Sequence, residues 1–344
     1  MARNVLLIGS IPLASADAVF EAVGRELDGL VRRVPDGEIG ERHDWVAWQS
    51  AAFGRIPFIE RVEAARLAAV GVDNLPKGPQ YRVRPGFPTA AVRFGPLGYA
   101  DAAAQSYRAF TAARAAGKLP AGCRFQVGIA TALSVVGQYV DGAFQAAIEP
   151  AYEQRLLEEV DEIAKAVPRG DLAIQWNLAT ELSIIEGRRP VYFGKVWDGI
   201  FERVVRACER VPDGVELGLH FCFRDFEFHG FPLPGDLDGI VDLANGLSGS
   251  VGRSIEWMHF PVPAGTTDAV YFAPLRRLTL RDETDLYLGV IHAGREMAET
   301  ARQVACAASA VPGFGIACEC GFGDIAGNEV AGLLRTHRAC AEAG

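Results

Sequence analysis

Short apolar runs alternate with longer amphipathic segments from one end of this 344-residue sequence to the other. This alternation restricts the fold more than any other feature, because strand and helix patterns in regular succession are typical of a parallel sheet covered by helices. Eight strands favour closure of the sheet, so we expect an α/β protein with a (β/α)8 TIM-barrel fold. The expected strands begin near Asn4, Leu30, Arg124, Leu172, Val215, Arg253, Asp285 and Gly313.

Amphipathic stretches between these runs predict the helices. Tyr152 to Ala166 places apolar side chains on one face and acids on the other, and Trp197 to Val211 and Arg295 to Val311 repeat the pattern. Pro and Gly follow each of the three stretches, as expected where a helix ends and the chain returns to a strand.

The stretch between the second and third expected strands is far longer than the other connections. We expect it to hold a helix near Trp45, a Pro- and Gly-rich piece from Pro76 to Pro96, and a helix from Ala102 to Ala116. No segment rich in Ser, Gly or Pro marks a domain boundary. We therefore expect one domain over residues 1–344, with an elaborated loop region after the second strand that lies over the barrel mouth.

Composition and charge limit the partners. The net charge of −9 argues against a nucleic-acid or anionic-membrane surface, because either needs clustered Lys and Arg. A small anionic substrate remains compatible, since one local Arg is enough to bind it. The opening apolar run, Val5 to Ile8, is too short to span a membrane or to serve as a signal sequence. The odd count of seven cysteines argues against a disulfide framework, so we expect reduced thiols and a cytoplasmic protein.

Reactive side chains fall at the carboxyl ends of the expected strands, which form the active-site face of this fold. One strand ends in His220-Phe221-Cys222, and residues two apart on a strand point the same way, so the imidazole and the thiol project together. Cys320 ends the last strand at the same height. An imidazole with two thiolates selects zinc over magnesium or calcium. The alternative is that all three are ordinary core residues, which the convergence of two strand ends makes the weaker interpretation.

Seven motifs, in this order, resemble the catalytic barrel of cobalamin-independent methionine synthase. Each motif is weak alone, but together they cover nearly the whole chain. The second barrel of the full-length family enzymes is absent, so the chain is similar to single-barrel relatives. Uroporphyrinogen decarboxylase and epoxyalkane:thiol transferases share the wider superfamily, so barrel and zinc do not fix the reaction. The motifs are Ile8-Gly9-Ser10-Ile11-Pro12, the segment Asp36 to Val46, Ile174-Gln175-Trp176-Asn177, His220-Phe221-Cys222, Ser254-Ile255-Glu256, Gly289-Val290-Ile291-His292 and Cys320-Gly321.

The resemblance implies one zinc ion, held by His220, Cys222 and Cys320 with an acidic fourth ligand. Glu256 and His259 both lie near the end of the sixth expected strand. They are three residues apart, so a regular strand points them to opposite faces and only one can face the metal. The match of Ser254-Ile255-Glu256 to the family favours Glu256.

The resemblance also implies the residues that contact the substrate. Ser10, Glu38 and Asn177 occupy substrate-binding positions, and the family uses the acid at Glu38 to hold the substrate's ammonium. Asn177 departs from the family, which has Asp at that place, so we expect homocysteine to be a poor substrate. His292 is the expected proton donor to the leaving group, and the alternative is a histidine that caps the following helix.

These residues favour a zinc-dependent methyl- or alkyltransferase that alkylates a small-molecule thiol. The identity of the methyl donor stays open: a folate, a corrinoid protein and a small methylated metabolite are all compatible with these residues. A second hypothesis is a lyase that makes or breaks a carbon–sulfur or carbon–carbon bond on the same metal. A third is an inactive barrel that only binds zinc or a ligand, against which the retention of His220, Cys222 and Cys320 argues.

Overall fold

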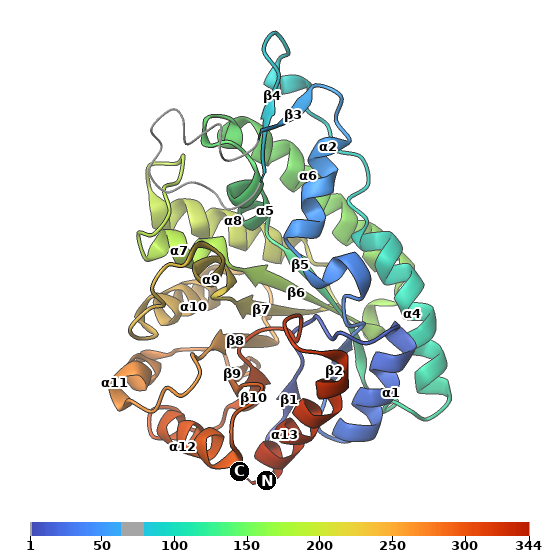
Figure 1. The fold of residues 1–344 in the computed structure, drawn as a ribbon, viewed down its shortest axis with the longest axis vertical. Helices are drawn as coiled ribbons and strands as arrows, with labels where there is room; N and C mark the ends of the chain where they lie inside the picture. The colour runs from blue at the N-terminus through green and yellow to red at the C-terminus, as the bar shows by residue number, and fades with distance from the viewer. Residues whose placement is uncertain (1, 63–78, 344) are drawn as a thin grey trace.

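A computed structural model describes residues 2–62 and 79–343 and shows eight parallel strands in a nearly closed barrel (Figure 1). The strands run in the order β1-β10-β9-β8-β7-β6-β5-β2, and a parallel bridge from Val5 to Val31 brings β1 back beside the chain that leads into β2. The expected TIM-barrel fold is thus confirmed. The strands are β1 (Val5–Leu6), β2 (Arg33–Pro35), β5 (Arg124–Ala130), β6 (Leu172–Leu178), β7 (Glu216–Phe221), β8 (Trp257–Pro261), β9 (Asp285–Ile291) and β10 (Gly315–Cys318).

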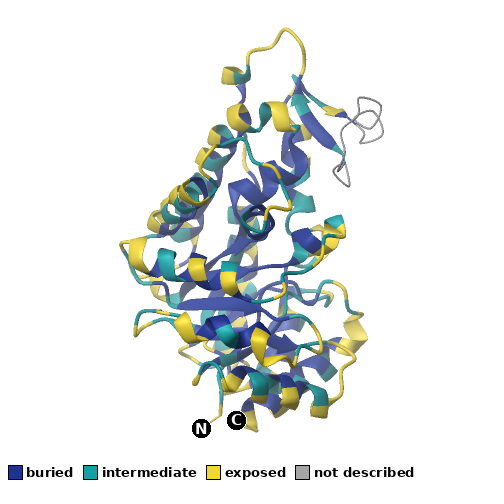
Figure 2. Cartoon of the chain, turned by 90° about the vertical axis from the view of Figure 1, so that its left-hand side faces the viewer, coloured by how far each residue is buried: buried dark blue, intermediate teal, exposed yellow. Residues whose placement is uncertain are grey.

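Helices surround the barrel, with their apolar faces inward and their outer sides exposed (Figure 2). The expected helix from Trp197 to Val211 corresponds to α8, whereas the one from Tyr152 to Ala166 is only the second half of the longer α6. Within the described ranges, no helix is long and apolar enough to cross a membrane. The outer helices are α1 (Ala16–Leu27), α4 (Tyr99–Ala115), α6 (Gly142–Ala166), α8 (Val196–Arg210), α10 (Asp238–Ser250), α12 (Met297–Ala308) and α13 (Val330–Glu342).

Short helices follow several strands and build the carboxyl-end face of the barrel. They are α5 (Ala132–Tyr139) after β5, α7 (Thr180–Ile185) after β6, α9 (Arg224–His229) after β7 and α11 (Ala269–Phe272) after β8. Short elements at this end leave room for functional side chains to project from the strand ends.

The long stretch between β2 and β5 matches the prediction in part. The helix expected from Ala102 to Ala116 is present as α4, whereas the segment before it differs. The helix expected near Trp45 is replaced by the 3-10 turns Gly40–His43 and Ala47–Gln49 and the short α2 (Ser50–Gly54). A two-stranded antiparallel sheet of β3 (Ile59–Val62) and β4 (Gln80–Val83) follows, which no periodic pattern had indicated. Of the Pro- and Gly-rich piece from Pro76 to Pro96, residues 76–78 lie outside the described residues.

Apolar side chains from five strands or strand ends fill the barrel interior at its amino end. Trp257, from β8, is wholly buried there, and the guanidinium of Arg33 stacks over its ring at 4.1 Å while it pairs with Glu216 at 2.8 Å. This packing fills the barrel interior at one end, which leaves the opposite end for a site inside the barrel. The interior cluster consists of Leu6, Ile8, Ala173, Trp257, Tyr287 and Ala317. That residues 1–344 form one domain stays a prediction.

Candidate metal centre and substrate pocket

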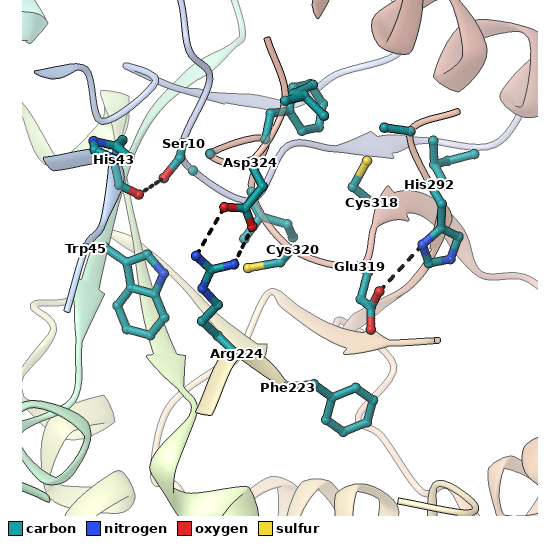
Figure 3. Close-up of a pocket in the computed structure, with 18 of the residues that line it drawn as sticks. Ser10, His43, Trp45, Phe223, Arg224, His292, Cys318, Glu319, Cys320 and Asp324 are labelled. Carbon is teal, nitrogen blue, oxygen red and sulfur yellow. Dashed lines mark hydrogen bonds and ion pairs between the residues drawn. The ribbon is translucent and has the colours of Figure 1, made fainter. Parts of the chain in front are cut away.

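A cavity of about 390 Å³ opens at the carboxyl ends of the strands. It is lined by residues from the ends of β1, β2, β6, β7, β9 and β10, which lie far apart in the sequence (Figure 3). Six of the eight residues predicted for the site line it, namely Ser10, Glu38, Asn177, His220, His292 and Cys320. Cys222 lies directly behind the wall, where it is wholly buried.

Three predicted metal ligands converge at one side of this cavity. The Sγ atoms of Cys222 and Cys320 are 3.5 Å apart, and Cys320 Sγ lies 3.6 Å from His220 Nε2. All three ligand atoms lie within 4.8 Å of one another. No other such cluster of three or more His, Cys, Asp or Glu side chains occurs among the described residues.

The spacing and chemistry of these donors fit zinc. A tetrahedral zinc ion with ordinary bond lengths places two sulfurs about 3.8 Å apart and a sulfur about 3.6 Å from a nitrogen. Burial lowers the pKa of His220 well below its usual value, so its imidazole is neutral, as a ligand must be. Contact with Cys320 and burial raise the pKa of the Cys222 thiol, so binding of a metal at this place would release protons.

Glu256 does not reach this group, and the expected fourth ligand has to be corrected. Strand β8 begins at Trp257 rather than near Arg253, so Glu256 precedes the strand. Its Oε2 accepts a hydrogen bond of 2.6 Å from the backbone N–H of Leu217, and its own N–H donates to the Leu217 carbonyl. Leu217 lies near the amino end of β7, so the Glu256 carboxylate is at the closed end of the barrel.

His259, the rejected alternative, lies beside His220, because the two are register partners on β7 and β8. The Nδ1 atoms of the two rings are 2.8 Å apart, and Nε2 of His259 lies 2.9 Å from the carbonyl oxygen of Cys318. Both nitrogens of His259 are thus engaged within the protein. The chain supplies three ligands, and neither candidate for the fourth is free to serve.

We expect Glu256→Gln to retain the full metal content of the wild type, because its side chain lies away from the ligands and a glutamine oxygen can still accept from Leu217. Metal analysis of the purified variant beside Cys222→Ser checks this. A folded Glu256→Gln protein that had lost its metal would return Glu256 to the ligand set.

Glu38 is held at the cavity in a strained backbone conformation. Its φ of 46° is the only positive value of a non-glycine residue in the described ranges. Strain of this kind persists where the surroundings enforce it, and it gathers at functional sites. The enforcing contacts are the Ser10 hydroxyl, which donates to Glu38 Oε2 at 2.6 Å, and Asp36, which accepts from the Glu38 N–H at 2.9 Å.

The space around the Glu38 carboxylate is made by two glycines. A Cβ atom on Gly9 or on Gly128 would lie 2.7 Å from Glu38 Oε1, so neither position can carry a side chain without displacing the carboxylate. Burial raises the pKa of Glu38 to about 7. The group therefore shifts between its neutral and its charged form near neutral pH.

A chain of amides fixes how Asn177 faces the cavity. The indole N–H of Trp257 can only donate, and it lies 3.4 Å from Gln175 Oε1, so this oxygen is the acceptor. The Nε2 of Gln175 therefore points the other way, where it donates to the Ile8 carbonyl at 2.8 Å and to Asn177 Oδ1 at 2.9 Å. Asn177 thus presents its Nδ2 hydrogens on the other side, toward Gly128. Where the resemblance places a carboxylate, this pocket offers a donor.

His292 follows β9 and faces Glu319, a residue that the sequence reasoning missed. Figure 3 shows the pair, with His292 Nδ1 3.5 Å from Glu319 Oε2. Burial lowers the pKa of His292 to about 4 and raises that of Glu319 to about 8. The other atoms of the pair, His292 Nε2 and Glu319 Oε1, are buried without a hydrogen-bond partner. The signal in the sequence was an acid directly before a predicted ligand at a strand end.

The mouth of the cavity carries further residues that no sequence motif indicated. Arg224, at the start of α9, forms a bidentate ion pair with Asp324 beside Cys320 (Figure 3). Trp45 and Phe223 line the same opening. Trp45, near which a helix was expected, lies in the loop region between β2 and β5 and contributes to the pocket wall.

No protein-family model matches this sequence, and a search of curated proteins found no match. Solved structures that share the fold include the following three. One is a B12-independent methionine synthase from a Shewanella species in complex with selenomethionine, with a TM-score of 0.63 and 14% identity over 100% of this chain and 97% of that one. The second is a putative vitamin-B12-independent methionine synthase from Listeria monocytogenes, with a TM-score of 0.53 and 13% identity over 95% and 86%. The third is a methyltransferase from Methanosarcina mazei, with a TM-score of 0.57 and 11% identity over 99% and 94%. At these identities the likeness is one of fold.

Proposed function

We propose that this protein is a zinc-dependent methyl- or alkyltransferase that acts on a small-molecule thiol. The observation that carries the proposal is the convergence of His220, Cys222 and Cys320 at the edge of a cavity, with ligand spacings that fit zinc. The structures with this fold described above, a methionine synthase, a putative methionine synthase and a methyltransferase, support the same class of reaction.

Three protein ligands would leave one position of a bound zinc ion for the substrate, as in catalytic rather than structural zinc sites. Zinc bound there would lower the pKa of a substrate thiol, so that a nucleophilic thiolate exists near neutral pH. Glu38 and Asn177 bind the polar end of the thiol substrate beside the ligand cluster, since Asn177 on β6 is the register partner of His220 on β7. These contacts orient the sulfur toward the ligand cluster.

The transfer forms a sulfur–carbon bond to the alkyl group and breaks the bond between that group and its carrier. The carrier leaves with the electron pair and takes up a proton. Glu319, whose raised pKa keeps a proton on its carboxyl group near neutral pH, supplies this proton, and His292, which faces the cavity beside it, passes the proton to the carrier. The carrier is a folate, a corrinoid protein or a small methylated metabolite, and the mouth residues Trp45 and Phe223 offer it flat apolar surfaces.

The direct test combines metal analysis with product analysis. We expect the purified protein to contain zinc and to convert a thiol and a methyl donor into a thioether. Products that arise from one substrate by cleavage or formation of a carbon–sulfur or carbon–carbon bond would instead support a lyase. Binding of zinc without any turnover across thiols and donors would favour a barrel that only binds its ligand.

Homocysteine is expected to be a poor methyl acceptor for the wild type. The variant Asn177→Asp is expected to raise kcat/KM for homocysteine. An amide nitrogen cannot pair with the ammonium of an amino acid, and a charge-assisted hydrogen bond is about twice as strong as a neutral one. If the new carboxylate stabilises the bound ammonium by about 1.4 kcal/mol, kcat/KM for homocysteine rises about tenfold. The assay uses methyl-folate and a methyl-corrinoid as donors, and compares homocysteine with 3-mercaptopropionate, which lacks the ammonium. Efficient methionine formation by the wild type would refute the prediction.

A further inference from the structure

Two buried histidines meet at the metal centre, and the protons on their rings can be assigned from their neighbours. His259 Nε2 lies 2.9 Å from the Cys318 carbonyl oxygen, which only accepts, so this nitrogen carries a proton. The ring is wholly buried among uncharged partners, which are His220 and the backbone carbonyls of Cys318 and Phe221, so it stays neutral. A neutral ring carries a single proton, and the 2.9 Å contact with the Cys318 oxygen places that proton on Nε2. Its Nδ1 is therefore a bare acceptor.

That acceptor fixes the ring of His220. The two Nδ1 atoms are 2.8 Å apart, so one proton lies between them and it belongs to His220. A neutral imidazole with its proton on Nδ1 has a free electron pair on Nε2. Nε2 is the atom that lies 3.6 Å from Cys320 Sγ, on the side where the ligand atoms converge.

The backbone around Cys318 places its carbonyl oxygen against His259 Nε2. The register of β10 on β9 shifts between Ala317 and Cys318, an irregularity that redirects the backbone groups beyond it. Opposite it stands Gly289, where a Cβ atom would lie 2.8 Å from the Cys318 oxygen and 2.9 Å from His259 Nε2. A side chain at this position would occupy the place of the hydrogen bond.

We infer that His259 is a positioning residue, which holds His220 with its proton on Nδ1 and thereby presents Nε2 as a metal ligand. The chain of contacts runs from the Cys318 carbonyl through His259 to His220. The part of the inference that concerns zinc rests on the proposed function, whereas the placement of the protons does not. The resemblance that favoured Glu256 assigned no role to His259.

The first test reads the protons directly. Long-range ¹⁵N–¹H spectra of the full-length protein, as purified and after dialysis against a chelator, distinguish the two forms of each imidazole. We expect His220 to be protonated on Nδ1 and His259 on Nε2 in both samples, with assignments from His220→Asn and His259→Asn. A His220 ring protonated on Nε2 after dialysis would overturn the inference, whatever the metal content.

The second test measures zinc affinity by competition with a chelator. His259→Leu removes the acceptor and is expected to weaken zinc binding by about 10- to 100-fold, the usual effect of losing such a partner. His259→Asn keeps an oxygen at the place of Nδ1 and should bind zinc within about threefold of the wild type. Gly289→Ala leaves His259 in the chain but displaces its hydrogen bond to Cys318, so it should weaken zinc binding to a similar extent.

His337 supplies the matched control, since it is also a wholly buried histidine bonded to a carbonyl, that of Leu333 in α13. His337→Asn is expected to leave zinc affinity unchanged. Equal zinc affinity in the wild type and in a folded His259→Leu would refute the positioning role. Absence of zinc affinity in the wild type would instead refute the proposed function, and the proton placement would then be decided by the spectra alone.

Discussion

Cys320→Ser is expected to abolish metal binding and turnover while the protein stays folded. The wild type should bind about one zinc ion per chain, since one cluster of three donors is present. A serine hydroxyl does not replace a thiolate as a zinc ligand, so the variant should bind almost none. The barrel has a large apolar core of its own, so its folding does not depend on the metal.

The measurement is elemental analysis of protein purified under reducing conditions without chelator, with circular dichroism as the check on folding. Cys306→Ser is the matched control, because this thiol lies on the outer helix α12 and donates to the Thr267 carbonyl. It should retain zinc and activity. Wild-type protein that is free of metal after this purification would contradict the zinc site.

His292→Asn is expected to retain zinc and thiol binding but to lower turnover by about 10²-fold or more, the usual scale for the loss of a general acid. The reason is geometric, since His292 lines the cavity beside Glu319 and is not one of the three clustered donors. The effect should fall on kcat and leave the affinity for the thiol unchanged. Single-turnover rates with saturating thiol measure it without interference from product release.

His43 offers the control for this variant. It also lines the cavity, but its ring Nδ1 lies 2.7 Å from the Gly40 carbonyl within its own turn. His43→Asn should therefore change turnover only slightly. If His292→Asn turned over at the wild-type rate, His292 would be a structural residue that caps the connection after β9.

The barrel was predictable from the sequence because its signals are local. Apolar runs and amphipathic stretches each report on a few neighbouring residues, and they located α8 and most of the strands to within a few residues. The start of β8 was misjudged because the polar residues Arg253, Ser254 and Glu256, which precede Trp257, were counted with the strand. The boundary is set by the contact of Glu256 with Leu217, which no local pattern encodes.

In the candidate site, too, the residues that depend on local sequence were predictable and the contacts between strands were not. His220 and Cys222 follow from one strand and its period of two, and Cys320 from a second strand end. The partnership of His220 with His259 depends on the register between two strands, and the bond to the Cys318 carbonyl depends on an irregularity in a third. Such relations between strands are fixed only when the barrel closes, so the sequence pattern could not supply them.

The packed amino end of the barrel has a consequence for the order of events. Because Trp257, Tyr287 and their neighbours fill the interior there, the cavity is a chamber with a floor, and reactants exchange through the mouth between Trp45 and Arg224. In the transfer reaction proposed above, the acceptor would have to settle at the floor before a bulky carrier covers it. The alkylated product then leaves only after the spent carrier has gone, which makes the two-substrate kinetics ordered, with the small molecule first in and last out.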